Sequence, residues 1–421
     1  MGQSLSFVNL TLRAKIKEAP KQSNFGELLH LHKNHPLKSL FNSCDLEEVK
    51  SLLFRTGSTT EFDLVNRVET ITSSDQFRKI QIHYHKKGTV KDVLTHHGFD
   101  TASEMELLRS TLLENQQPKF SQRVAYATNK LRGCFGIENV FQISPILTGR
   151  DENLITLAGE PLKFEFSYTG SHDQFINIRR AEKRSYELLR VLNVLLRDSM
   201  WFGPRYSTEE WFYDYESQTN RTAFVGFVDS AVGSPSGSLF DCGLPAAKCE
   251  PPNDYYENMH VALGDDMVFP SNLQSLLSTY SSLPGNEKNA YDMAISWYAD
   301  ARKIAPISSS ACFNTLATAI ECLLDDKVET CGECSQPKYG ISRKFNEFLI
   351  QYVPMKNGID RAKTFKDLYS TRSTLVHGSG KYAHDLFGSM GGFETTRDRA
   401  ELRLMIQVAK VALINWLISK Q

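Results

Sequence analysis

The sequence predicts an α+β fold, with a mixed α/β region over residues 1–284 and a helical region over residues 285–421. Three observations predict it. Short segments of the first half alternate between apolar and polar residues, as strands do. Breaks rich in glycine and proline follow them. Beyond the last break, apolar residues recur at helical spacing almost to the end of the chain. A length of 421 residues fits about two or three domains.

The first half contains three expected strands and one expected helix. Residues 79–85 alternate between an apolar face and a polar face, and residues 162–168 repeat this alternation with aromatic side chains. Residues 223–228 have the composition of a more buried strand. Between the last two strands, residues 179–197 carry leucines near helical spacing, which predicts a helix. This region could form two subdomains.

The boundary of the helical region lies near residue 284, where residues 281–285 combine serine, proline and glycine. Each helix expected after it has an apolar stripe that faces a core. The stripes are Tyr291, Ala294, Ile295 and Tyr298; Phe313, Leu316, Ala317, Ile320, Leu323 and Leu324; Phe345, Phe348 and Leu349; Phe365, Leu368, Tyr369 and Val376; and Leu402, Met405, Ile406, Ala409, Leu413, Trp416 and Leu417. The fourth helix runs from about Lys363 to His377, because Gly378 readily ends a helix. Amphipathic helices with short connections form an antiparallel bundle.

Composition indicates a soluble globular protein, and we expect it in the cytoplasm. The hydrophobic share of 41% and the charged share of 23% are typical of that class. No apolar run is long enough to span a membrane, and we expect no membrane partner. The first residues lack a secretory signal. They do match the pattern for myristoylation of Gly2, which leaves a membrane-anchored signalling protein as an alternative.

No metal and no other cofactor is expected. The eight cysteines are scattered along the chain, which predicts reduced thiols. Cys331 and Cys334 form the one close pair, and a zinc site needs about four ligands. His83 and His85 would share one face of a strand, but no neighbouring ligand in the sequence completes a set. A metalloenzyme is therefore the weakest of the alternatives.

The segment over residues 368–378 reads Leu-Tyr-Ser-Thr-Arg-Ser-Thr-Leu-Val-His-Gly. It resembles the signature of HEPN domains, in which an arginine precedes a histidine by a few residues. The preceding helix, which ends in Ala-Ile-Glu-Cys-Leu-Leu over residues 319–324, resembles the Apea-like HEPN branch, as does the long apolar helix that follows. The resemblance covers residues 285–421. It implies a metal-independent endoribonuclease that uses Arg372 and His377.

The resemblance also implies a biological setting. Two HEPN domains would form a homodimer, so that both motifs meet in one cleft. The substrate would be RNA, with tRNA among the candidates. The role would be prokaryotic antiviral or stress defence by abortive infection. Residues 1–284 would then sense a phage-derived molecule or a nucleotide, or restrain the nuclease.

The chemistry of the two side chains suits RNA cleavage. Histidine titrates near neutrality and can move the proton of the attacking 2′-hydroxyl. Arginine stays protonated and offers a planar set of donors to phosphate oxygens. Five residues of helix turn a side chain by about 500°, so the two lie about 140° apart. A second subunit would complete the site.

Substrate contacts are expected from Ser373, Lys366, Tyr369 and Lys381, through phosphate contacts and base stacking. Solvated lysines and a core tyrosine are the alternative for these residues. Arg372 could instead pair with an acid such as Asp367, and His377 could cap the helix. Many active HEPN domains carry Asn, Asp or His where this chain has Ser373. A catalytically inactive HEPN module for RNA binding or dimerisation is therefore the second hypothesis.

Overall fold

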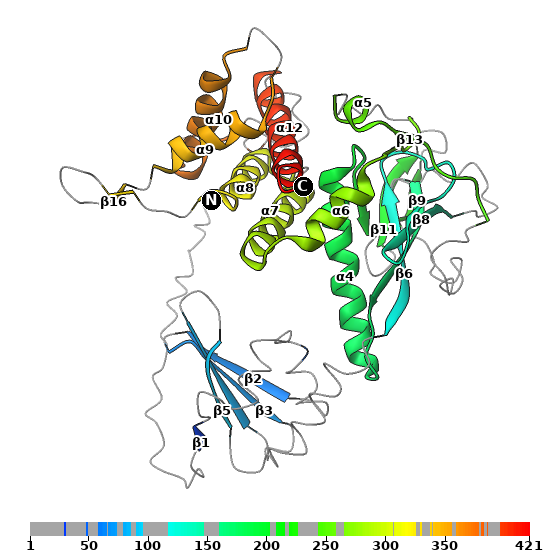
Figure 1. The fold of residues 1–421 in the computed structure, drawn as a ribbon, viewed down its shortest axis with the longest axis vertical. Coiled ribbons are helices and arrows are strands. Elements are labelled where there is room, and N and C mark those ends of the chain that lie inside the picture. Colours follow the sequence, from blue (N-terminus) through cyan, green and yellow to red (C-terminus); the bar gives the residue numbers. More distant parts are fainter. Residues whose placement is uncertain are drawn as a thin grey trace, which may run out of the picture. The chain divides into compact units, whose positions relative to one another are not determined.

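The structure, a computed structural model, confirms the α+β fold, with sheets mainly in the first half and most helices in the second (Figure 1). It divides into two compact units, residues 1–116 with 171–176, and residues 117–170 with 177–421. The described residues are 29–30, 48, 58–64, 66–73, 79–85, 90–95, 117–146, 160–202, 208–214, 219–225, 243–257, 265–305, 307–325, 329–330, 337–338, 340–355, 359–378, 380–382, 385 and 396–421.

The first unit contains an antiparallel sheet in the order β1-β5-β4-β3-β2. Its strands are β1 (Leu29–His30), β2 (Ser58–Asp63), β3 (Val68–Ser73), β4 (Lys79–Tyr84) and β5 (Val90–Thr95). β4 confirms the alternation expected at residues 79–85, because Ile80 and Ile82 are buried, whereas Gln81 and His83, which alternate with them, are half-buried. Ile71 and Val93 from the neighbouring strands are buried as well. One face of this sheet therefore forms an aliphatic core.

The second unit begins with another antiparallel sheet, in the order β10-β6-β9-β8-β7. Its strands are β6 (Pro118–Ala127), β7 (Phe135–Ile137), β8 (Phe141–Pro145), β9 (Glu160–Thr169) and β10 (Met200–Phe202). β9 contains the expected aromatic strand, with Phe164 and Phe166 fully buried. Phe141 of β8 packs against Phe164, with ring centroids 5.9 Å apart. Alternation in the sequence thus marks the buried face correctly.

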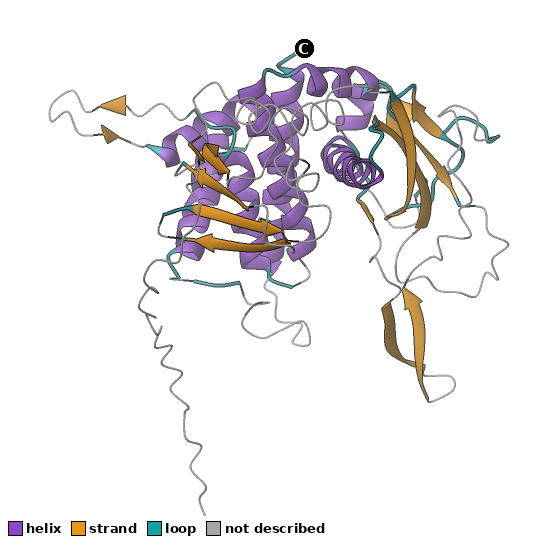
Figure 2. Cartoon of the chain, turned by 90° about the horizontal axis from the view of Figure 1, so that it is seen from below, coloured by secondary structure: helices purple, strands orange, loops and turns teal. Residues whose placement is uncertain are grey.

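A long helix, α4 (Gln174–Leu195), covers this sheet and confirms the helix expected at residues 179–197. Figure 2 shows it end-on between the sheet and the helical bundle. Its leucines at 188, 189, 192 and 195, and Leu196 directly after it, belong to the same buried cluster as the sheet. Short elements complete this part: β11 (Thr208–Asp214), β12 (Thr219–Val225), β13 (Cys249–Glu250), α5 (Pro252–Glu257) and β14 (Phe269–Pro270). The strand expected at 223–228 is present through Val225, and its remainder lies outside the described residues.

The helical bundle confirms the expected helices. It consists of α6 (Leu273–Ser282), α7 (Gly285–Ile304), α8 (Ser309–Glu321), α9 (Ile341–Tyr352), α10 (Arg361–Val376) and α12 (Thr396–Ile418). The expected stripes are buried in α7, in α9 and in α8 as far as Ile320. Leu323 and Leu324 lie beyond the end of α8 and are half-buried, as is Ile406 of α12. Helix α6 precedes the proposed boundary, and its Leu276 and Tyr280 share one buried cluster with α4 and α7. Side chains on both sides of residue 284 therefore pack in a common core.

Two details of the helical region differ from the sequence analysis. Val376 was expected in the core, but 48% of it is exposed. It lies on the face of Phe365 but about three turns further along, in the last turn of α10. The region is also not wholly helical, because β15 (Glu329–Thr330) pairs with β16 (Pro337–Lys338). Cys331 and Cys334 lie between these strands, outside the described residues.

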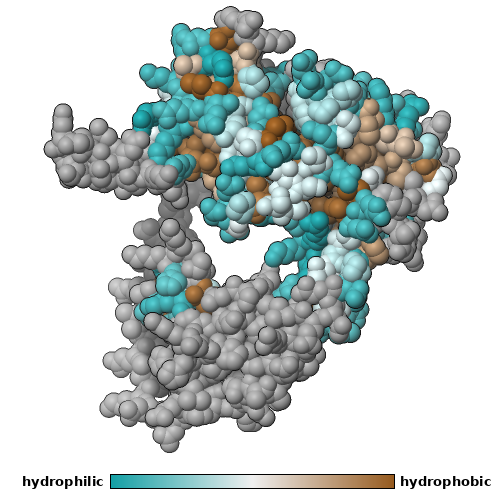
Figure 3. Space-filling model, in the orientation of Figure 1, coloured by the Kyte–Doolittle hydropathy of each residue, from teal (hydrophilic) through white to brown (hydrophobic). Residues whose placement is uncertain are grey.

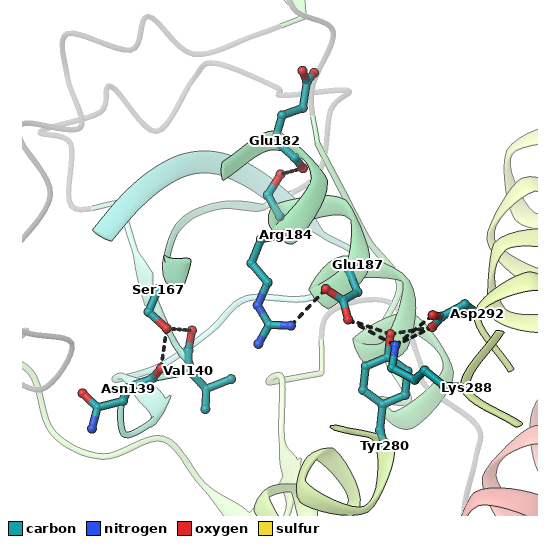
Figure 4. Close-up of polar contacts among 10 residues, drawn as sticks. Asn139, Val140, Ser167, Glu182, Arg184, Glu187, Tyr280, Lys288 and Asp292 are labelled. Carbon is teal, nitrogen blue, oxygen red and sulfur yellow. Dashed lines mark hydrogen bonds and ion pairs between the residues drawn. The ribbon is translucent and has the colours of Figure 1, made fainter. Parts of the chain in front are cut away.

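A polar cluster joins α4 to the bundle (Figure 4). The ammonium of Lys288 lies 3.3 Å from Glu187 of α4 and 2.8 Å from Asp292 of α7. The Tyr280 hydroxyl lies between the same two carboxylates, and Lys288 Nζ is 3.7 Å from the centre of its ring. Burial raises the pKa of Glu187, but Arg184 and Lys288 outweigh it and hold the pKa below its usual value. These ion pairs and hydrogen bonds connect α4, α6 and α7.

Candidate functional site

Helix α10 carries the Arg-His motif, and its two ends are well defined. The Asp360 side chain accepts a hydrogen bond from the Lys363 amide (3.1 Å) and so caps the N-terminus. Phe365 and Leu368 are buried and hold the helix against the bundle. The expected stop is confirmed, because Gly378 has a φ of +71°, in the left-handed region.

Arg372 lies on α10 facing α8. Its Nη2 donates to Glu321 Oε2 at 3.0 Å, and the two side chains are 23% and 20% exposed. The acid that pairs with it is therefore Glu321, not Asp367, which is exposed. The contact is a single hydrogen bond. Arg372 Nε and Glu321 Oε1 are both buried, and neither has a hydrogen-bond partner among the described residues.

Tyr369 lies beside Arg372 and packs on α9. Its ring centroid is 5.0 Å from that of Phe345 and 5.7 Å from the Arg372 guanidinium carbon. Burial raises the pKa of its hydroxyl, and the charge of Glu321 raises it further. The half-buried ring thus braces the arginine from one side, and the predicted stacking on a base has to use the exposed part of the ring.

His377 occupies the C-cap of α10, and its side chain is exposed. Its backbone amide donates to the carbonyl of Ser373 (3.0 Å), which continues the helical pattern by one residue. Within the described part of the chain, no hydrogen bond joins His377 to Arg372. Five residues of helix separate the two along the axis by about 7.5 Å. One chain therefore presents both groups on the same helix end, but does not bring them into contact.

The other predicted substrate contacts lie on α10 and in the segment that follows it. Lys366 and Lys381 are exposed, and Ser373 is half-buried. Exposed lysines fit phosphate binding and fit side chains that only contact solvent, so the roles of these three residues stay predictions.

Three further residues tie the motif to its surroundings, and sequence reasoning missed them. Thr371, next to Arg372, donates to Glu401 of α12 at 2.6 Å. The Tyr382 hydroxyl lies 3.3 Å from the same carboxylate, and its amide donates to the Ser310 hydroxyl at 3.0 Å. Burial raises the pKa of Tyr382, and Glu401 raises it further. Of these residues, Glu401 carries a signal in the sequence, because it is an acid within the long apolar helix.

Asp385 anchors the chain that follows the motif to the N-terminus of α8. Its carboxylate accepts hydrogen bonds from the amides of Ser309 and Ser310, both at 2.8 Å. Burial raises the pKa of this carboxyl, but hydrogen bonds from Ser310, Ser309 and Ser308 outweigh burial and hold it below its usual value. A carboxylate at this place also favours the helix dipole. The segment that follows α10 is thus tied to the N-terminus of α8.

The two histidines considered as metal ligands belong to the first unit. His83 lines a cavity on the first sheet with Asp63, Asn66, Val68, Thr70 and Gln81, whereas His85 is exposed. Among the residues that the structure describes, no group of three or more His, Cys, Asp or Glu side chains is arranged to hold a metal ion.

Comparison of the chain with models of known protein families, with curated protein sequences and with solved structures finds no match. In the described part of the chain, no helix has both the length and the hydropathy needed to cross a membrane. Gly2, the predicted acylation site, lies outside the described residues.

Proposed function

We propose that the chain is a metal-independent endoribonuclease of the HEPN type, in which Arg372 and His377 act on RNA. The observation that supports the proposal is the setting of Arg372. Glu321 uses one of its donors and Tyr369 flanks it, while 23% of the side chain remains exposed at the helix end that carries His377. An oriented guanidinium suits phosphate binding better than a freely rotating one.

The reaction follows from these groups. His377 removes the proton of the 2′-hydroxyl, whose oxygen attacks the adjacent phosphorus. Arg372 donates hydrogen bonds to the phosphorane oxygens and stabilises their negative charge. The bond from phosphorus to the 5′-oxygen then breaks, and the leaving oxygen takes up a proton from a second group. The products are a 2′,3′-cyclic phosphate and a free 5′-hydroxyl.

A homodimer supplies the second group. One motif holds a single histidine, and its arginine stays protonated, so one motif cannot supply both acid and base. Two copies of α10 related by a two-fold axis would place a second histidine in the cleft. Apolar side chains are exposed on α9 and α10, namely Ile341, Ile350 and Val376. The face of the molecule drawn in Figure 3 mixes hydrophilic areas with smaller hydrophobic ones. Exposed apolar residues suit a contact between copies.

The proposed setting is cytoplasmic antiviral or stress defence by abortive infection in prokaryotes, with RNA or tRNA as the target. In this proposal the N-terminal region restrains the nuclease until a phage-derived molecule or a nucleotide is present.

The test compares the full-length protein with Arg372→Ala and His377→Ala on total RNA. Exposed residues of the same types supply the controls, Arg132→Ala and His85→Ala. We expect cleavage by the wild type and both controls, with and without EDTA, and about a hundredfold or greater loss in each motif variant. A 2′-deoxy nucleotide at the cleaved position should block the reaction. Undiminished cleavage in both motif variants would contradict the assignment.

The oligomeric state gives a separate test. Sedimentation of the wild type should show a dimer, and an active monomer would contradict the composite site.

The ion pair itself favours the second candidate, an inactive HEPN module for RNA binding or dimerisation. Arg372 engaged by Glu321 could serve only to join α10 to α8. RNA binding without cleavage, unchanged by EDTA, would support this alternative.

A further inference from the structure

A cavity of about 380 Å³ lies in the second unit, away from the Arg-His motif. Its wall is formed by the end of β6, the turn after α4, and the helices α7 and α12. Cavities that hold small organic ligands have volumes of about 300–1,000 Å³. The size therefore fits one molecule of the size of a nucleotide.

Two arginines at this cavity have no carboxylate partner among the described residues. Arg302 of α7 donates to the Ser199 hydroxyl at 3.3 Å, and Arg403 of α12 is exposed. A third arginine shows the contrast. Arg197 forms an ion pair with Glu250 at 2.9 Å, and its Nε donates to the carbonyl of Tyr255. The charge of Arg197 is thus neutralised, and that of the other two is available to a ligand.

The deep part of the cavity is polar as well. Lys410 is 8% exposed, and its ammonium donates to the carbonyls of Leu196 and Arg197. Burial and the charge of Arg302 lower its pKa to about 7. Asp198 is 3% exposed, and burial raises its pKa to about 6. Asp198 Oδ1 has no hydrogen-bond partner among the described residues, although it is buried.

An unsatisfied buried oxygen is costly, so it points to a ligand that brings a donor. A carboxylate would weaken the binding of a bare phosphate ion. The Asp198 carboxylate instead suits a ligand that carries hydroxyl or amino groups beside its phosphate. The apolar side chains of Ile406 and Val411 complete the lining.

We propose that this cavity binds a nucleoside phosphate, with Arg302 and Arg403 on the phosphate and Asp198 on a donor of the nucleoside. The site is separate from the motif, and its binding does not depend on the proposed nuclease activity. A link to that activity is built into α12. The helix carries Arg403 and Lys410, and two residues before Arg403 lies Glu401, which holds Thr371 of α10. A bound phosphate would thus act on the motif helix through α12; this second step rests on the proposed function.

The test is calorimetric titration of the full-length protein with the ribonucleoside 5′-mono-, di- and triphosphates, their nucleosides and inorganic phosphate. At least one nucleotide should bind. Arg302→Gln and Arg403→Gln should each raise its Kd by about tenfold or more, because each removes a charged hydrogen bond. Both residues are exposed, so these variants should fold. Lys303→Gln and Arg397→Gln, on the same two helices, serve as controls and should leave Kd unchanged.

Three results would overturn the proposal. These are no binding by any nucleotide, binding by both variants as tight as by the wild type, and a nucleoside that binds as tightly as its phosphate. If a single-stranded RNA oligomer binds more tightly than any nucleotide, and through the same two arginines, then the ligand of the cavity is RNA and the proposal of a small molecule is wrong. The regulatory step predicts that the nucleotide changes RNA cleavage by the wild type but not by Arg403→Gln. A protein that cleaves no RNA would refute the proposed function and leave the calorimetric result intact.

Discussion

The pair formed by Glu321 and Arg372 gives the sharpest test of the site. Glu321→Ala removes the carboxylate that lies 3.0 Å from the guanidinium. The arginine then keeps its charge in a position where only 23% of its side chain reaches solvent. Glu321→Gln keeps an acceptor at the same place and removes only the charge, so its effect should be smaller.

The burial of the pair sets the size of the effect. An exposed ion pair contributes about 0–1 kcal/mol, and removal of one partner from a fully buried pair costs about 3–5 kcal/mol. Side chains that are 20% and 23% exposed, joined by one hydrogen bond, lie between these limits. We expect Glu321→Ala to lower the free energy of unfolding by about 2 kcal/mol. The coupling to Arg372→Ala should be about 1 kcal/mol.

Urea unfolding of the wild type, both single variants and the double variant, followed by circular dichroism, measures this coupling. The control cycle uses Arg343 and Glu347, an exposed pair 4.0 Å apart, where the coupling should stay below about 0.5 kcal/mol. In the RNA assay, Glu321→Ala should lower cleavage by about tenfold, because an arginine without its partner is poorly oriented.

A coupling below about 0.3 kcal/mol would show that the two side chains do not act as a pair. Cleavage equal to that of the wild type in Glu321→Ala would refute the idea that the carboxylate orients the catalytic arginine.

Three further predictions concern the supports of the site. Phe365→Ala should cost about 3–5 kcal/mol in unfolding free energy, because the ring is fully buried; a loss below about 1 kcal/mol would mean that α10 is anchored elsewhere. Asp385→Ala should cost about 1 kcal/mol near neutral pH, since it removes the acceptor at the N-terminus of α8. The pKa of this carboxyl is lowered on folding, so its contribution is present above the usual value and lost as the pH falls below it; a cost that persisted at low pH in a titration of thermal stability would contradict this assignment. Lys288→Met should destabilise the protein by about 1–2 kcal/mol, because Glu187 and Asp292 lose their shared cation, and a loss unaffected by salt would argue against a charge effect.

The sequence by itself determined the local elements. Period-two alternation identified the buried face of β4, and helical spacing identified the stripes of α7, α8 and α9. Gly378 ended α10 as expected, because glycine adopts the left-handed conformation of a helix C-terminus at little cost. These properties depend on neighbours a few residues away. Val376 was wrongly assigned to the core, because helical spacing does not show how far along a helix its neighbours pack against it.

Only the tertiary structure decided which side chains meet. Glu321 and Arg372 are 51 positions apart in the sequence, and Asp385 and Ser310 at the N-terminus of α8 are 75 positions apart. The cavity near Arg302 and Arg403 depends on how α7 and α12 pack beside the turn after α4. An acid or a base in an apolar helix has many potential partners in a sequence. Helix packing selects one of them, because only that arrangement both fills the core and satisfies the buried charge.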